Sequence, residues 1–279
     1  ILTNMRSLRQ YTLVLSCTLL GLLSPVVSLV THPTGDVARH AKKPAKTELR
    51  ALAQHAAAAA SLFDNMRGPA SMIAGSIVPL GFLAKLPEPA DGQVEGLFGL
   101  TLRRMYVLVT VASLTNVLLS VMYSTVASNQ LTETFVAPAA SVWCLIQRDF
   151  NLAWLGTNAH FIAGIFGFMW MVGTRAYLSV TASGQPCMVA ASAVGMAVSG
   201  LLLMVSVVNR GVAAGGGGEM TYGSNFLALI SRYFVLLLKQ ATSSKTFGPL
   251  QLAAVVIASV STVVGVTAAI RGSVSSKNN

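Results

Sequence analysis

The stretch MYVLVTVASLTNVLLSVMYSTVA, residues 105–127, decides the fold class of this chain. It holds no charged side chain, and it is long enough to cross the hydrocarbon layer of a bilayer, which takes about 20 predominantly apolar residues. Arg103 and Arg104 stand directly before it, as basic residues commonly do at the ends of membrane-spanning helices. The segment therefore predicts a transmembrane helix.

Three further segments share this pattern, at residues 153–178, 187–208 and 250–270. The composition of the chain agrees with them: of 279 residues, 53% are hydrophobic and only 10% are charged, and the mean hydropathy is +0.65. Soluble domains carry about one quarter charged residues, so an ordinary soluble enzyme and a disordered chain are both excluded. We expect an all-α, polytopic membrane helix bundle with four transmembrane helices.

Two weaker apolar segments accompany these four. Residues 69–84 are short for a span and contain Pro79, so they form a short fifth span, a re-entrant piece or an interfacial helix. Residues 226–239 repeat apolar side chains at i, i+3, i+4 spacing, with Arg232 and Lys239 off that stripe. This pattern favours an amphipathic helix in the headgroup plane over a span.

The first 63 residues have the composition of a leader. Residues 1–28 combine an early basic region with an apolar core, which is typical of a signal peptide, although a first transmembrane helix is the alternative. Residues 29–63 are basic, poor in acids and rich in alanine, as transit peptides are. In series, the two resemble the two-part presequence of plastid proteins in algae with secondary plastids, such as diatoms and dinoflagellates. A mitochondrial leader or a tail behind a membrane anchor are the alternatives. Residues 64–279 are then the bundle.

Each predicted helix carries a seam of small or weakly polar residues. Such seams let helix backbones approach closely, and serine or asparagine can hydrogen-bond across the contact. We expect them to pack helices together, and the alternative for the serines of the first helix is the polar lining of a pore. The predicted packing residues are Ser113, Asn116, Ser120, Ser124, Gly156, Gly164, Gly167, Gly195, Ser199, Ala258 and Gly265.

His160 is the histidine that lies inside a predicted span, and an ionisable residue at that depth is a functional-site hypothesis by default. Gly156 and Gly164, one turn away on either side, leave room beside its ring. A neutral imidazole there would ligate a flat macrocycle, with chlorophyll as the candidate. The alternative is a histidine hydrogen-bonded to an adjacent helix. Arg175 is expected to snorkel to the membrane interface or to hold an anionic headgroup.

The chain has nine acidic residues, and none lies inside a predicted span. Buried carboxylates mark proton relays and cation pathways, so their absence from the spans argues against an ion-coupled pump. No catalytic motif is present, and we expect neither an enzyme nor a metal site. The net charge of +10 comes from singly scattered basic residues, which does not indicate nucleic-acid binding.

These features predict a non-catalytic accessory or scaffold subunit of a large organelle membrane complex, with other membrane subunits and lipid as its partners. The preferred setting is the plastid thylakoid, in a photosystem or its antenna. The mitochondrial inner membrane and a secretory-pathway membrane are the alternative locations. The alternative function is a channel or carrier for neutral or anionic solutes.

Overall fold

The computed structural model describes residues 46–88, 97–134, 136–184, 186–214, 226–242 and 249–275. Every regular element in this part of the chain is a helix, which confirms the predicted all-α class. In chain order the elements are α2 (Lys46–Val78), the π-helical turn η1 (Pro79–Leu83), α3 (Leu97–Glu133), α4 (Val142–Asp149), α5 (Asn151–Ala182), α6 (Cys187–Ala214), α7 (Phe226–Thr242) and α8 (Pro249–Ser275).

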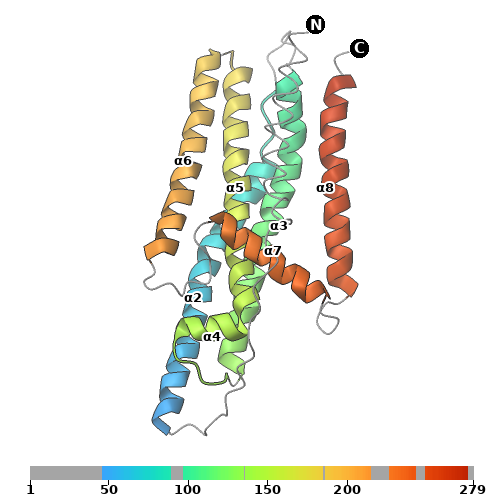
Figure 1. The fold of residues 1–279 in the computed structure, drawn as a ribbon. Coiled ribbons are helices and arrows are strands. Elements are labelled where there is room, and N and C mark those ends of the chain that lie inside the picture. The colour runs from blue at the N-terminus through green and yellow to red at the C-terminus, as the bar shows by residue number, and fades with distance from the viewer. Residues whose placement is uncertain are drawn as a thin grey trace.

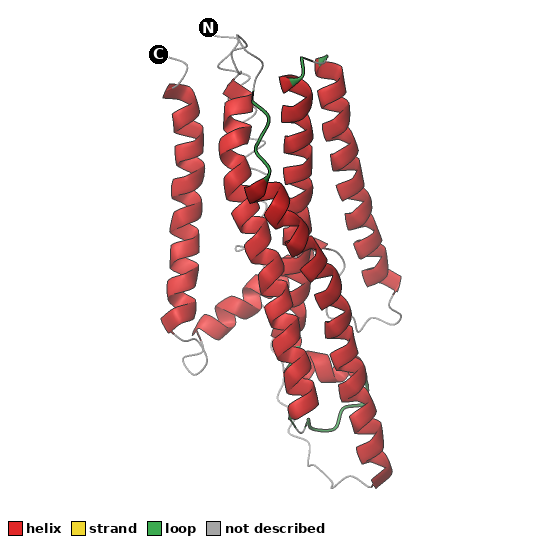
Figure 2. Ribbon diagram, turned by 180° about the vertical axis from the view of Figure 1, so that it is seen from behind, coloured by secondary structure: helices red, strands yellow, loops and turns green. Residues whose placement is uncertain are grey.

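Helices α3 and α5 form the centre of the bundle and run antiparallel to each other (Figure 1). Helix α2 packs along α3, while α6 packs on α5 and α8 packs on α3. The views from the front and from behind both place α6 and α8 on opposite sides of this centre (Figures 1 and 2). Helix α7 slants across the bundle near the lower ends of α6 and α8, and α4 lies below it (Figure 1).

Three helical stretches are long and apolar enough to cross a membrane: Phe98–Glu133, Asn151–Ala182 and Met188–Val207. They contain the first three predicted spans almost entirely. The structure does not show the fourth. Helix α8 is formed over Pro249–Ser275, but its apolar stretch among the described residues, Val256–Ala269, is shorter than a bilayer requires. Four spans were expected, and three are found in this part of the chain.

The weaker segment at residues 69–84 is a continuous extension of α2 that ends in η1. It packs against α3 at short range, because a Cβ at Gly81 would lie only 2.2 Å from Cγ2 of Thr110. Tyr106 of α3 donates a hydrogen bond from its hydroxyl to the carbonyl oxygen of Leu80 over 2.8 Å. One face of the segment therefore packs on the bundle, whereas Met72 and Leu83 are exposed, at 76% and 75%.

The first half of α2, which lies within the predicted transit-like segment 29–63, packs against the other helices. Ala59, Ala60 and Phe63 are buried in a core shared with α3, α4, α5 and α7. The ring of Phe63 meets that of Trp154 edge-on, with 5.3 Å between their centroids. A cut at residue 63 would remove these buried side chains, and the position of the boundary stays a prediction. The predicted segment 1–28 and the first part of 29–63 lie outside the described residues.

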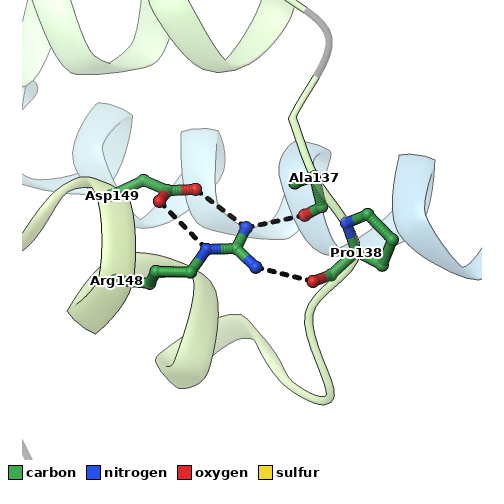
Figure 3. Close-up of polar contacts among 4 residues, drawn as sticks. All are labelled: Ala137, Pro138, Arg148 and Asp149. Atoms are coloured by element: carbon green, nitrogen blue, oxygen red, sulfur yellow. Dashed lines mark hydrogen bonds and ion pairs between the residues drawn. The ribbon is translucent and has the colours of Figure 1, made fainter. Parts of the chain in front are cut away.

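Arg148, in the last turn of α4, fastens the loop that precedes this helix (Figure 3). Its guanidinium donates to the carbonyl oxygens of Pro138 and Ala137, each over 2.7 Å. It also donates to both carboxylate oxygens of Asp149, at 2.9 and 2.8 Å. The hydrogen bond that Arg148 donates to Asp149 raises the pKa of Arg148 above its ordinary value, so the guanidinium stays charged.

We expect Arg148→Met to lower the melting temperature by a few degrees, because the two loop carbonyls lose their donor. The effect is about 1 kcal/mol or less, since the side chain is 42% exposed. Arg148→Lys should recover only part of the loss, because an ammonium does not reproduce the planar fork. Arg67→Met is the matched control: this arginine is equally exposed and pairs with Asp64 across one helix turn at 3.3 Å. Equal losses in the two methionine variants would contradict the assigned role.

Candidate functional site

The interface between α3 and α5 is built from the small residues of both helices. Ser113 donates its hydroxyl to the carbonyl oxygen of Gly164 over 2.7 Å, and Ser120 donates to that of Thr157 over 2.8 Å. A Cβ at Gly164 would lie 2.2 Å from Cγ2 of Val117. At this distance only glycine fits, so the two backbones meet where the side chain is missing.

His160 lies between these two serine contacts and joins three helices. Its Nδ1 is 2.7 Å from Oδ1 of Asn116 on α3, and its Nε2 is 2.7 Å from the hydroxyl of Tyr233 on α7. The ring of Tyr123 on α3 stacks on the imidazole at 5.8 Å, with 12° between the planes. The hydroxyls of Tyr123 and Tyr233 are 3.4 Å apart. We call these four residues the His160 network.

The hydrogen bonds of Asn116 determine which nitrogen of His160 carries the proton. The Nδ2 amide of Asn116 donates to the carbonyl oxygen of Ala112 over 2.8 Å, so its Oδ1 is the atom that faces the imidazole. An amide oxygen only accepts, so Nδ1 of His160 donates and its Nε2 accepts the hydroxyl proton of Tyr233. The hydrogen bonds of the network therefore run in one direction from donor to acceptor: Tyr233 donates to His160, and His160 donates to Asn116.

This arrangement does not fit a macrocycle ligand at His160. A metal would need a ring nitrogen with a free lone pair. The lone pair of Nε2 accepts from Tyr233, and Nδ1 carries the proton given to Asn116. Chlorophyll ligation would require Tyr233, and with it α7, to move away. The histidine is instead hydrogen-bonded to adjacent helices, which is the alternative that the sequence left open.

No protein-family model, curated protein or solved structure matches the chain. The role of the network is therefore argued from its geometry. It joins α7 to the central pair, while Ser113 and Ser120 face α5 and hydrogen-bond to its backbone. The serines of α3 thus occupy a closed helix contact, which is the packing role expected for them.

The remaining predicted packing residues divide into two groups. Gly156, Gly167 and Gly265 each lie against a neighbouring helix: a Cβ at these positions would meet Tyr123 at 3.1 Å, Ser113 at 2.6 Å and Leu108 at 3.1 Å. Ser124 is also buried, and its hydroxyl donates to the carbonyl oxygen of Val121 one turn earlier. In contrast, Gly195, Ser199 and Ala258 are exposed, and nothing lies within 4 Å of a Cβ at Gly195. The seam of α6 and part of that of α8 face away from the bundle.

Two contacts of this site were not predicted from the sequence. Tyr123 and Tyr233 were not recognised as partners of His160, although Tyr233 lies on the apolar stripe of residues 226–239. Arg175 donates to the carbonyl oxygens of Leu80, Ala84 and Lys85, at 3.2, 3.1 and 3.0 Å, and its expected place at the membrane interface stays a prediction. These include carbonyls at the end of η1, which have no partner within the helix, so Arg175 acts as a helix cap.

Proposed function

We propose that the protein is a non-catalytic structural subunit of a membrane complex, held in the bilayer by its apolar helices. The observation that carries this proposal is the contrast between the centre and the sides of the bundle. Of the most apolar 18-residue stretch of α6, only 6% is buried, against 33% for α3 and for α5. Ser113, Ser120 and His160 of the centre are engaged in hydrogen bonds between its own helices. Outer helices with free small-residue faces suit contacts with further transmembrane helices.

The fourth span in α8 and the placement of α7 in the headgroup plane are parts of this proposal. So is the setting: the leader-like composition before α2 favours an organelle, with the plastid thylakoid preferred. The boundary of any removed segment then lies before the packed half of α2. Chlorophyll at His160 is not part of the proposal, because both ring nitrogens are engaged.

Native separation of mildly solubilised membranes, followed by mass spectrometry, tests the proposed role. We expect the protein to migrate in a complex with other membrane subunits. Migration of the chain alone, without partners, would contradict the proposal. Co-migration with photosynthetic subunits would support the thylakoid setting. Co-migration with respiratory subunits would support the same structural role in the mitochondrial inner membrane.

A variant on the outer face of α6 sharpens this test. We expect Gly195→Leu to reduce co-migration by severalfold, because the leucine fills the space in which a partner backbone would lie. Gly75→Leu on α2 is the matched control, since nothing lies within 4 Å of a Cβ at either glycine. Both variants should melt like the wild type in detergent. An unchanged complex in Gly195→Leu would remove α6 as the contact face.

A further inference from the structure

Helices α3 and α5 are longer than a bilayer is thick. They have 37 and 32 residues, which at about 1.5 Å per residue gives lengths of about 55 and 48 Å. The hydrocarbon layer is only about 30 Å thick. A substantial part of both helices therefore extends beyond it, and the positions of the charged residues show at which end.

Three arginines lie at one level of the central pair. Phe98 of α3 and Tyr177 of α5 meet edge-on at 5.5 Å, which brings the stretch holding Arg103 and Arg104 beside the stretch holding Arg175. About 20 residues, or about 30 Å, further along α3 lies Tyr123, and the same step back along α5 ends just before His160. Neither helix carries Asp, Glu, Lys or Arg between these two levels. One bilayer thickness thus separates the arginines from the level of Tyr123 and Gly156, whereas His160, 15 residues from Arg175, is about 22 Å away along the helix.

Helix α7 is attached at this second level. Leu229, Ile230 and Tyr233 are buried against the bundle, and Tyr233 reaches His160. The opposite face is also apolar, because Leu227 and Leu238 are more than half exposed, at 64% and 60%. A helix with water on its outer side would carry polar residues there. The ends of α6 and α8 lie near the same level (Figure 1).

We propose that α7 lies along one surface of the bilayer, with its outer apolar residues among the acyl chains and Arg232 and Lys239 at anionic lipid headgroups. The 17 residues of α7 include no acidic side chain, so its charge is purely positive. Helix α4, the first half of α2 and the adjoining ends of α3 and α5 then form a lobe in the aqueous phase. The inference rests on the proposed membrane location and not on the partner subunits.

Depth measurements in lipid nanodiscs test the position of α7. An environment-sensitive fluorophore is attached to Val111→Cys, Val235→Cys or Glu133→Cys, in a background whose native cysteines are replaced by serine. We expect quenchers on lipid acyl chains to act on position 111, shallow lipid quenchers to act on position 235, and iodide in water to act on position 133. Quenching of position 235 by iodide and by no lipid quencher would overturn the proposal. Quenching of position 133 by lipid quenchers and not by iodide would also overturn it.

Retention of anionic lipid tests the charges. The purified protein is exchanged into mixed phosphatidylcholine and phosphatidylglycerol, and bound lipid is counted by native mass spectrometry. We expect Arg232→Gln and Lys239→Gln each to weaken retention of phosphatidylglycerol by about fivefold, the effect of one cation at an anionic surface. Arg148→Gln, on helix α4 of the aqueous lobe, is the control and should leave retention unchanged. Unaltered retention in the α7 double variant, or an equal loss in the control, would overturn the lipid contact. Failure here leaves the subunit role standing, since that is judged by co-migration.

Discussion

Gly164→Ala will lower the melting temperature of the bundle by several degrees. The new Cβ would lie 2.2 Å from Cγ2 of Val117, and the backbone nitrogen of Val117 and the carbonyl oxygen of Ser113 are 3.3 and 3.4 Å away. The side chain of Val117 or the backbone of α3 must therefore shift. Overpacking of this kind costs about 1–3 kcal/mol. The shift also lengthens the hydrogen bond from Ser113 to Gly164.

A double variant tells steric overlap from other causes. Val117→Ala alone should destabilise the protein, because Val117 is fully buried. The double variant Gly164→Ala, Val117→Ala should lose less stability than the two single variants lose together, since the missing methyl groups of Val117 make room for the new one. Gly195→Ala has open space and should be neutral or stabilising, because alanine is the better helix former by about 1 kcal/mol. Additive losses in the double variant would contradict the close contact. Thermal melting in detergent measures all four proteins.

His160→Leu will release α7 from the centre of the bundle. The change leaves Oδ1 of Asn116 and the hydroxyl of Tyr233 without their partner, and each such loss costs about 1–3 kcal/mol when the group is buried. Release is measured by thiol labelling of Ile230→Cys, a position that is 7% exposed in the wild type. We expect labelling to be at least tenfold faster in the His160→Leu background.

A second double-mutant cycle isolates the interaction between His160 and Tyr233. Tyr233→Phe removes only the hydroxyl, and it should destabilise less than His160→Leu because Asn116 keeps its donor. The double variant His160→Leu, Tyr233→Phe should lose less stability than the two single variants lose together, since both polar partners are then absent. Phe234→Leu, on the neighbouring and more exposed side chain, should change stability by about 0.5 kcal/mol or less. Slow labelling in all variants would mean that α7 is held by its apolar contacts alone.

The packing faces of α3 and α5 could be predicted, although their pairing could not, because each face is visible as a pattern. The serines of α3 together with Asn116, and the glycines of α5 together with His160, recur at three- and four-residue steps. The same kind of pattern on α6 was misleading, because Gly195 and Ser199 face outwards. A stripe of small residues shows which face permits a close approach, but not which helix provides the other side.

The partners of His160 and Arg175 were beyond prediction for a different reason. His160 and Tyr233 are separated by 73 residues, and Arg175 and Leu80 by 95. A periodic pattern reports the neighbours of a residue along one helix, whereas these contacts depend on how helices assemble. The first half of α2 was assigned to the leader because its alanine run matches transit-peptide composition. The sequence pattern alone did not show that Ala59 and Phe63 are buried against other helices.

The separation between His160 and Tyr233 also bears on how the bundle is completed during synthesis. Asn116 precedes His160 in the chain, so Nδ1 can find its acceptor as soon as α5 meets α3. The hydroxyl for Nε2 arrives only after another 73 residues, with α6 already made. At about 5–20 residues per second, the ribosome needs roughly 4–15 seconds for that distance. For this interval the nascent chain keeps a polar ring without its second partner, and α7 supplies that partner before α8 is made.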